Sequence, residues 1–190
     1  MESDYDFKLA TYKIAKHEAG HWLAAYKLGW RPREIEITAP ESARGHYGYA
    51  QTTYGVQLIT IDDVRDYARG RVKILYSGAY AENYDGKDFD RKQIQNDMGR
   101  GGGAYSDFFK AEEIYFFYYN CLENKKDWEA EFSPIICDVQ FMIEMHYAFI
   151  DKVGRLAEEK VNIAGDRVNF SPEELEAIFL QSEIRLPDFS

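Results

Sequence analysis

The stretch His17-Glu18-Ala19-Gly20-His21 lies inside a segment whose apolar residues recur at helical spacing. Residues four apart share one face of a helix, so His17 and His21 can present imidazole nitrogens to one zinc ion. Glu18 then lies beside the metal, where its carboxylate can take a proton from bound water. The pattern predicts a Zn²⁺ site with a general base in the first helix.

We expect this helix to span about residues 6–28, because the apolar spacing continues on both sides of the motif. The residues that give the spacing are Tyr12, Ile14, Ala15, Ala19, Leu23, Ala24 and Leu28. Gly29 and Pro32 follow and form a natural stop.

Two short strands are predicted next. Residues 34–38 read Glu-Ile-Glu-Ile-Thr, and this period of two is typical of a half-buried strand. The segment 47–54 holds Tyr47, Tyr49 and Gln51 and resembles a second strand. We expect the two strands to pair as a hairpin.

Capping signals place the later helices. Thr60 followed by Asp63 predicts a helix over about residues 61–83. Residues 84–104 are rich in charge and glycine and are interpreted as a loop, after which a helix begins near Ser106 or Asp107.

Two more helices complete the sequence. Ser133-Pro134 predicts a long helix to about residue 162, with proline in its tolerated first position. Ser171 to Glu174 forms a capping box that begins a short last helix. The fold class is therefore mainly α with a small β-hairpin or sheet.

The length of 190 residues suits a single domain, 1–190. Within it we expect a zinc peptidase core over residues 5–125 and a C-terminal helical part, 126–190, packed on that core. Cys121 and Cys137 lie in no C-x-x-C pair, and we expect two buried free thiols.

Charge and hydropathy exclude several classes of partner. A net charge of −10, without a basic cluster, argues against nucleic acid and against docking on anionic lipid. The longest apolar run, 114–119, is too short to cross a bilayer, and the N-terminus lacks the apolar core of a signal peptide. We expect a cytoplasmic protein without membrane insertion.

A catalytic zinc site needs a third protein ligand and one position left open. Lys27 stands where the longer metzincin pattern has its last histidine, which excludes that class. The remaining candidates are His46, Glu82, Asp107 and His146. For the two histidines a surface or core role is favoured, while the residues alone leave Glu82 and Asp107 even.

Several motifs together resemble the proteolytic domain of the FtsH family of membrane-bound AAA+ zinc proteases. They are His17 to His21, Ile35 to Ile37, Gly48-Tyr49, Ser77 to Asn83, Gly102 to Asp107 and Val168 to Leu175. The resemblance extends over about residues 12–180, but only the first motif is specific by itself. It implies that Asp107 is the third zinc ligand and that Glu82 lies near the site in a supporting role.

The chain departs from this family in several respects. It contains no ATPase module and no transmembrane helix, so neither ATP-driven unfolding nor membrane anchoring carries over. Trp22 follows the second histidine, where the family has a small residue, and Ser77 and Asn83 differ from the family pattern. These changes affect the lining of the cleft.

The first hypothesis is a zinc metallopeptidase that hydrolyses unfolded or flexible polypeptides without ATP. Glu82 would orient a ligating histidine. Tyr47, Tyr49 and Gln51 would form a sheet edge to which an extended substrate adds. A homo-oligomer or a separate ATPase partner is compatible with this hypothesis.

The second hypothesis is a non-catalytic module in which zinc stabilises a surface for protein interaction or oligomerisation. The missing ATPase module favours it, because a peptidase without an unfolding motor can reach only flexible chains. The intact Glu18 argues against it, since a purely structural zinc site has no use for a base at that position.

Overall fold

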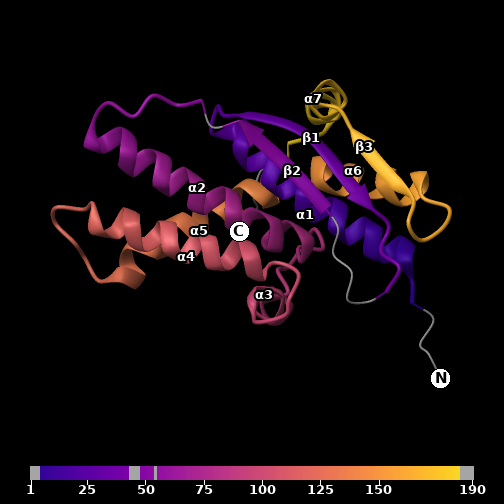
Figure 1. The fold of residues 1–190 in the computed structure, drawn as a ribbon, viewed down its shortest axis with the longest axis horizontal. Helices are drawn as coiled ribbons and strands as arrows, with labels where there is room; N and C mark the ends of the chain where they lie inside the picture. The colour runs from indigo at the N-terminus through magenta and orange to yellow at the C-terminus, as the bar shows by residue number, and fades with distance from the viewer. Residues whose placement is uncertain (1–4, 43–47, 54, 185–190) are drawn as a thin grey trace.

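The computed structural model of the chain describes residues 5–42, 48–53 and 55–184. These residues form seven helices and one three-stranded antiparallel sheet (Figure 1), which confirms the predicted mainly helical class. In chain order the elements are α1 (Phe7–Lys27), β1 (Arg31–Thr38), β2 (Gly48–Thr53), α2 (Ile61–Glu82), α3 (Arg91–Met98), α4 (Tyr105–Asn120), α5 (Trp128–Met145), α6 (Tyr147–Lys160), β3 (Arg167–Phe170) and α7 (Pro172–Gln181).

The sheet has the order β2-β1-β3, so β2 lies at one edge. Ile35 of β1 pairs with Ala50 of β2 on one side and with Phe170 of β3 on the other. The predicted pairing of the first two strands is confirmed. β3 was not predicted, because a strand of four residues offers only two buried positions, Val168 and Phe170, as a periodic signal.

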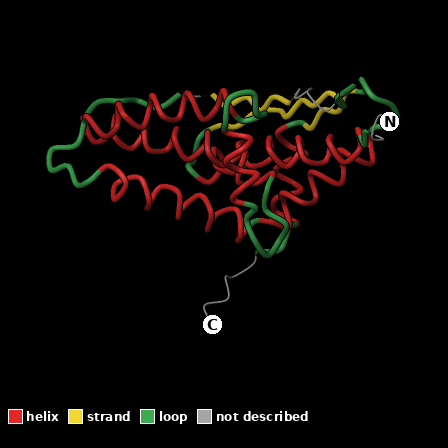
Figure 2. Tube along the Cα trace, turned by 90° about the horizontal axis from the view of Figure 1, so that it is seen from below, coloured by secondary structure: helices red, strands yellow, loops and turns green. Residues whose placement is uncertain are grey.

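Helix α1 lies at the centre of the molecule. Figure 2 shows the sheet along one side of the helices, and α1 contacts β1 and β2 on that side and α2 and α6 on others. Every residue from Ile14 to Ala25 is buried as a result, including both histidines and Glu18. Polar groups in such an interior are stable only when they are paired or otherwise compensated.

Gly20 lets α2 approach α1 closely. A Cβ atom at this position would overlap the carbonyl oxygen of Ser77 and lie 2.6 Å from the Cβ of Ala81. The absence of a side chain therefore brings the last turns of α2 directly against the His17–His21 segment.

One hydrophobic cluster joins the two predicted parts of the chain. It includes Trp22 of α1 and Val72 of α2, and also Ile143, Phe149 and Leu175 from beyond residue 125. The helices of the C-terminal part therefore pack on the same core as the helix that carries His17 and His21.

The predicted single helix from Ser133 to about residue 162 is wrong. α5 begins earlier, at Trp128, and contains Pro134 in its interior. Its first turns are held by contacts that the local sequence does not show, such as Phe132 packing on Tyr115 with ring centroids 4.9 Å apart. At His146 the helix breaks, and α5 then packs on α2 while α6 packs on α1.

The interpretation of residues 84–104 as loop is also wrong in part, because the segment contains α3. Asp90 caps this helix by accepting a hydrogen bond of 2.9 Å from the backbone N–H of Gln93. Only Ile94 of the eight residues is buried, so apolar periodicity could not reveal the helix.

Two further expectations have clear outcomes. Cys121 and Cys137 are free thiols as predicted, but Cys121 is half-buried and Cys137 exposed, so their predicted burial is wrong. Within the described residues, no helix combines the length and the apolar character that crossing a membrane requires.

Candidate metal centre

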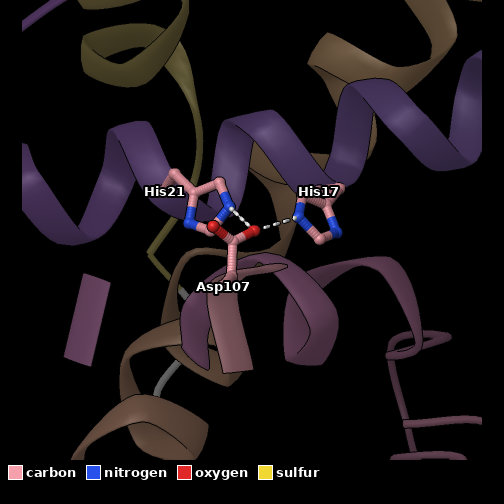
Figure 3. A group of neighbouring side chains, drawn as sticks. All are labelled: His17, His21 and Asp107. Atoms are coloured by element: carbon pink, nitrogen blue, oxygen red, sulfur yellow. Dashed lines mark hydrogen bonds and ion pairs between the residues drawn. The ribbon is translucent and has the colours of Figure 1, made fainter. Parts of the chain in front are cut away.

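His17 and His21 project from one face of α1 towards Asp107, which reaches them from the first turn of α4 (Figure 3). The Nε2 atom of His17 lies 3.4 Å from Oδ2 of Asp107, and the Nε2 atom of His21 lies 3.3 Å from the same oxygen. Within the described residues this is the one group of three side chains arranged to hold a metal ion. Asp107 is thus brought to the motif across 90 residues of sequence.

The separations of these donor atoms fit a zinc ion. Ligand atoms that lie about 2.0–2.2 Å from one zinc at tetrahedral angles are roughly 3.3–3.5 Å apart. The two separations from Oδ2 of Asp107, 3.4 Å to His17 and 3.3 Å to His21, fall in this range. Two imidazole nitrogens and one carboxylate oxygen are also a donor set that zinc accepts in catalytic sites.

The other ring nitrogen of each histidine has an acceptor as its partner. Nδ1 of His21 lies 2.7 Å from the carbonyl oxygen of Ile74, and Nδ1 of His17 lies 3.1 Å from Oε2 of Glu82. Each Nδ1 therefore carries the proton, and in the neutral imidazole the lone pair is on Nε2, which faces Asp107. Glu82 thus lies against the side of His17 that faces away from Asp107.

Three acceptor atoms then meet at one point and need a positive charge among them. Without a metal, a second proton on His17 supplies this positive charge. Burial lowers the pKa of His17, but its hydrogen bonds to Asp107 and Glu82 outweigh burial and raise the pKa to about 10. Burial raises the pKa of Asp107, but the hydrogen bonds from His17 and His21 outweigh it and hold that pKa well below its ordinary value. A divalent cation would serve the same electrostatic need.

Gly78 of α2 keeps this point free of side-chain atoms. A Cβ atom on Gly78 would lie 2.5 Å from Nε2 of His17 and 2.6 Å from Nε2 of His21. Any other residue would therefore occupy the space in front of both metal-facing nitrogens. Sequence reasoning noted Gly78 only as part of a motif and missed this role.

The turn before α4 positions Asp107. Asp97 of α3 accepts hydrogen bonds from Asn83 at 2.8 Å and from Gln93 at 2.7 Å, while its backbone carbonyl accepts one from Ala104 at 3.0 Å. The end of α2, the end of α3 and the start of α4 are thus tied together. The segment that was interpreted as loop is an ordered support for the third candidate ligand.

Glu18 lies next to the three candidate ligands and points into the same cavity. Its exposed fraction is only 4%, and burial raises the pKa of its carboxyl group. No described residue forms a hydrogen bond or ion pair with this carboxylate. At Gly48 a side chain would overlap Oε1 of Glu18, so the start of β2 passes directly over the carboxylate.

The cavity has a volume of about 460 Å³ and joins the metal centre to the sheet edge. Tyr49 and Gln51 of β2 line it, together with Glu18 and the three candidate ligands. Tyr49 is 52% exposed and stands at the rim. Tyr47, the other predicted substrate-binding residue, lies outside the described residues.

The two alternative histidines have different outcomes. His46 lies outside the described residues. His146 is buried at the junction of α5 and α6, where its ring packs on Phe179 with centroids 5.1 Å apart. It belongs to the core, as its sequence context favoured.

Two cationic residues of the cavity, Arg71 of α2 and Lys110 of α4, were not predicted as site residues. Each lies three positions from a residue of the metal centre, Ile74 or Asp107, and so shares its helix face. That relation is visible in the sequence only once α2 and α4 are known to flank one cavity.

In comparisons with known proteins, no family model and no curated protein matches the chain.

Proposed function

We propose that this chain is a zinc-dependent endopeptidase that cleaves unfolded or flexible polypeptides without ATP. The observation that carries the proposal is the position of the Glu18 carboxylate, which lines the same cavity as three convergent ligand atoms and forms no hydrogen bond or ion pair with any described residue. A carboxylate that is only 4% exposed is costly to keep ionised, and its place in the cavity beside the candidate ligands favours a chemical role for it.

His17, His21 and Asp107 would hold the zinc ion, and Glu82 and the Ile74 carbonyl would keep both imidazoles in the ligating tautomer. The ion would supply Lewis acidity, which polarises a carbonyl group and lowers the pKa of water. With two neutral histidines and one carboxylate the centre keeps a net positive charge, which suits that task.

Glu18 would act as the general base and then as the general acid. Its carboxylate accepts the proton of the attacking water and returns it to the nitrogen of the leaving amine. Burial that raises the pKa of Glu18 favours this exchange, because a carboxylate with an elevated pKa takes up a proton more readily.

The exposed edge of β2 would hold the substrate. Among the described residues β2 pairs with β1 alone, and its residues Tyr49 to Thr52 line the cavity. An extended polypeptide that adds to this edge gains main-chain hydrogen bonds that do not depend on its sequence. Its backbone would then run past the metal centre, as cleavage of an internal peptide bond requires.

The motifs that resemble FtsH-type proteases support the same function. They include the residues of the zinc helix and the Asp107 motif that meet in this cavity. The position of Glu18 in the cavity beside the candidate ligands favours the peptidase over a non-catalytic zinc module, which would gain nothing from a buried carboxylate there.

Metal analysis combined with a hydrolysis assay tests the proposal. The wild type should bind one zinc per chain and degrade casein, and a chelator should abolish degradation until zinc is restored. Asp107→Ala should lose zinc, whereas Glu82→Gln should keep it with about 10- to 100-fold weaker affinity. Stoichiometric zinc in Asp107→Ala, or casein degradation that survives removal of the metal, would refute the assignment.

A further inference from the structure

The part of the cavity wall that α2 and α4 form carries two cationic residues. Arg71 of α2 and Lys110 of α4 both line the cavity that contains Glu18 and the metal centre. The chain as a whole has a net charge of −10, so two cations in one cavity run against its overall charge. Charge of the opposite sign concentrated in a cleft attracts complementary ligands.

Both cations belong to the helix faces that build the centre. Arg71 precedes Ile74, whose carbonyl orients His21, by one helical turn, and Lys110 follows Asp107 by one turn. Their backbone positions are therefore held by the same packing of α2 against α4 that places the candidate ligands.

The acidic residues of the cavity do not neutralise Lys110. Its side chain is exposed, and no carboxylate among the described residues forms an ion pair with it. Asp107, one turn earlier on the same helix face, is instead engaged by His17 and His21. With zinc bound, the charges of Asp107 and Glu18 would be offset by the metal, and the charge of Lys110 would remain available to a ligand in the cavity.

We infer that Arg71 and Lys110 form a subsite for a carboxylate of the substrate, adjacent to the scissile peptide bond. An extended chain paired with β2 directs every second side chain to the face of the sheet on which the helices pack, where residues of α2 and α4 line the same cavity. The carboxylate comes either from an Asp or Glu side chain or from the free C-terminus of a peptide. This inference rests on the proposed peptidase function, whose substrate class it narrows.

Binding of fluorescent peptides to the zinc-loaded Glu18→Gln variant tests the subsite without hydrolysis. Three peptides of one sequence are compared: one with an internal Glu and an amidated C-terminus, one with Gln and a free C-terminus, and one with Gln and an amidated C-terminus. At least one of the two carboxylate peptides should bind about five- to tenfold more tightly than the neutral peptide. The tighter of the two identifies the source of the carboxylate.

Variants of Lys110 show whether the proposed subsite or the metal ion binds the carboxylate of the peptide. Lys110→Glu should abolish the preference for the carboxylate, and Lys110→Arg should keep it. Lys152→Glu, which makes the same charge change at an exposed position of α6, should leave the preference unchanged. Zinc content is measured in each variant and should not change.

Equal affinity for all three peptides would overturn the subsite, and so would a preference that survives in a variant with both Arg71→Gln and Lys110→Gln. Failure of the proposed function gives a different result, because the wild type would then leave all three peptides uncut while the carboxylate preference in binding persisted.

Discussion

Gly78 decides whether the two imidazoles have room for a metal ion. We expect Gly78→Ala to weaken zinc affinity by about 10- to 100-fold, because the new Cβ would lie 2.5 Å from Nε2 of His17. Competition with a chromophoric zinc chelator measures the affinity. Gly55→Ala is the control, since a Cβ there meets no atom within 4 Å. Unchanged zinc affinity in Gly78→Ala would show that the ion does not bind between the two Nε2 atoms.

His146 should make the stability of the fold depend on pH. Burial lowers the pKa of His146 to about 4, and the charge of Lys27 acts in the same direction. Between about pH 6.5 and pH 4 the unfolded chain therefore binds a proton that the folded chain rejects. The stability from this residue is present above about pH 6.5 and is lost as the pH falls towards 4.

We expect the loss to be on the order of 1–3 kcal/mol. Urea denaturation of the wild type and of His146→Phe at pH 7 and pH 5 measures it. The variant, whose ring still packs on Phe179, should lose less stability between the two pH values than the wild type does. Identical pH dependence of the two proteins would contradict a buried neutral His146.

At the scale of single elements, the cap of α2 should contribute to stability without affecting the metal centre. The Thr60 side chain accepts a hydrogen bond of 3.1 Å from the Asp63 N–H, and Asp63 accepts one of 2.7 Å from the Thr60 N–H. Thr60→Ala should therefore cost about 1 kcal/mol in the free energy of unfolding. Zinc content should be unchanged, because Ile74 and Gly78 lie several turns further along the helix.

Ser133→Ala in α5 is the matched control. Its hydroxyl donates to the carbonyl of Glu129 in the same helix, a contact of little energetic value. Urea denaturation should show a change within about 0.5 kcal/mol for this variant. An equal effect of both substitutions would mean that the Thr60 cap contributes nothing.

The elements that the sequence predicted correctly carry strong local signals. α1 and α2 have long apolar periodicity or a capping box, and both ends of α2 were predicted within one residue. The break at His146 and the position of Pro134 inside α5 depend instead on which helices α5 and α6 pack against. A cost of about 3 kcal/mol for proline in a helix made an N-terminal position the natural expectation, and tertiary contacts overrode it.

The residues of the candidate site also differ in whether local sequence or tertiary contacts place them. His17, Glu18 and His21 are set by helix geometry alone, whereas the approach of Asp107 depends on how α2, α3 and α4 are tied together through Asp97. Gly78 acts through the space it leaves open, which no side-chain pattern reveals.

At the scale of the whole molecule, the cavity and the strand edge predict which substrates are cleaved. Under the proposed function, the scissile bond would reach the candidate metal centre only in an extended chain paired with β2, so a folded substrate would be cut only when it opens locally. A destabilised variant of a substrate protein should therefore be digested faster than its stable parent, in proportion to its unfolded fraction.

ATP should have no effect on either rate, because the 190-residue chain contains no G-x-x-x-x-G-K-[ST] loop. Gel-based digestion of the two substrates, with and without ATP, measures both expectations. Equal rates on the two substrates, or acceleration by ATP in a pure preparation, would argue against a peptidase that works without a motor.

The most direct measurement of the central claim is the hydrolysis of an unstructured peptide by Glu18→Gln, with bound zinc quantified in the same sample. Glutamine has nearly the same size as glutamate, but its amide cannot accept the proton of water. The account predicts one zinc per chain in both proteins and a turnover in the variant that is lower by at least about 100-fold. Turnover equal to that of the wild type, at equal zinc content, would contradict the assignment of Glu18 as the base of a zinc peptidase.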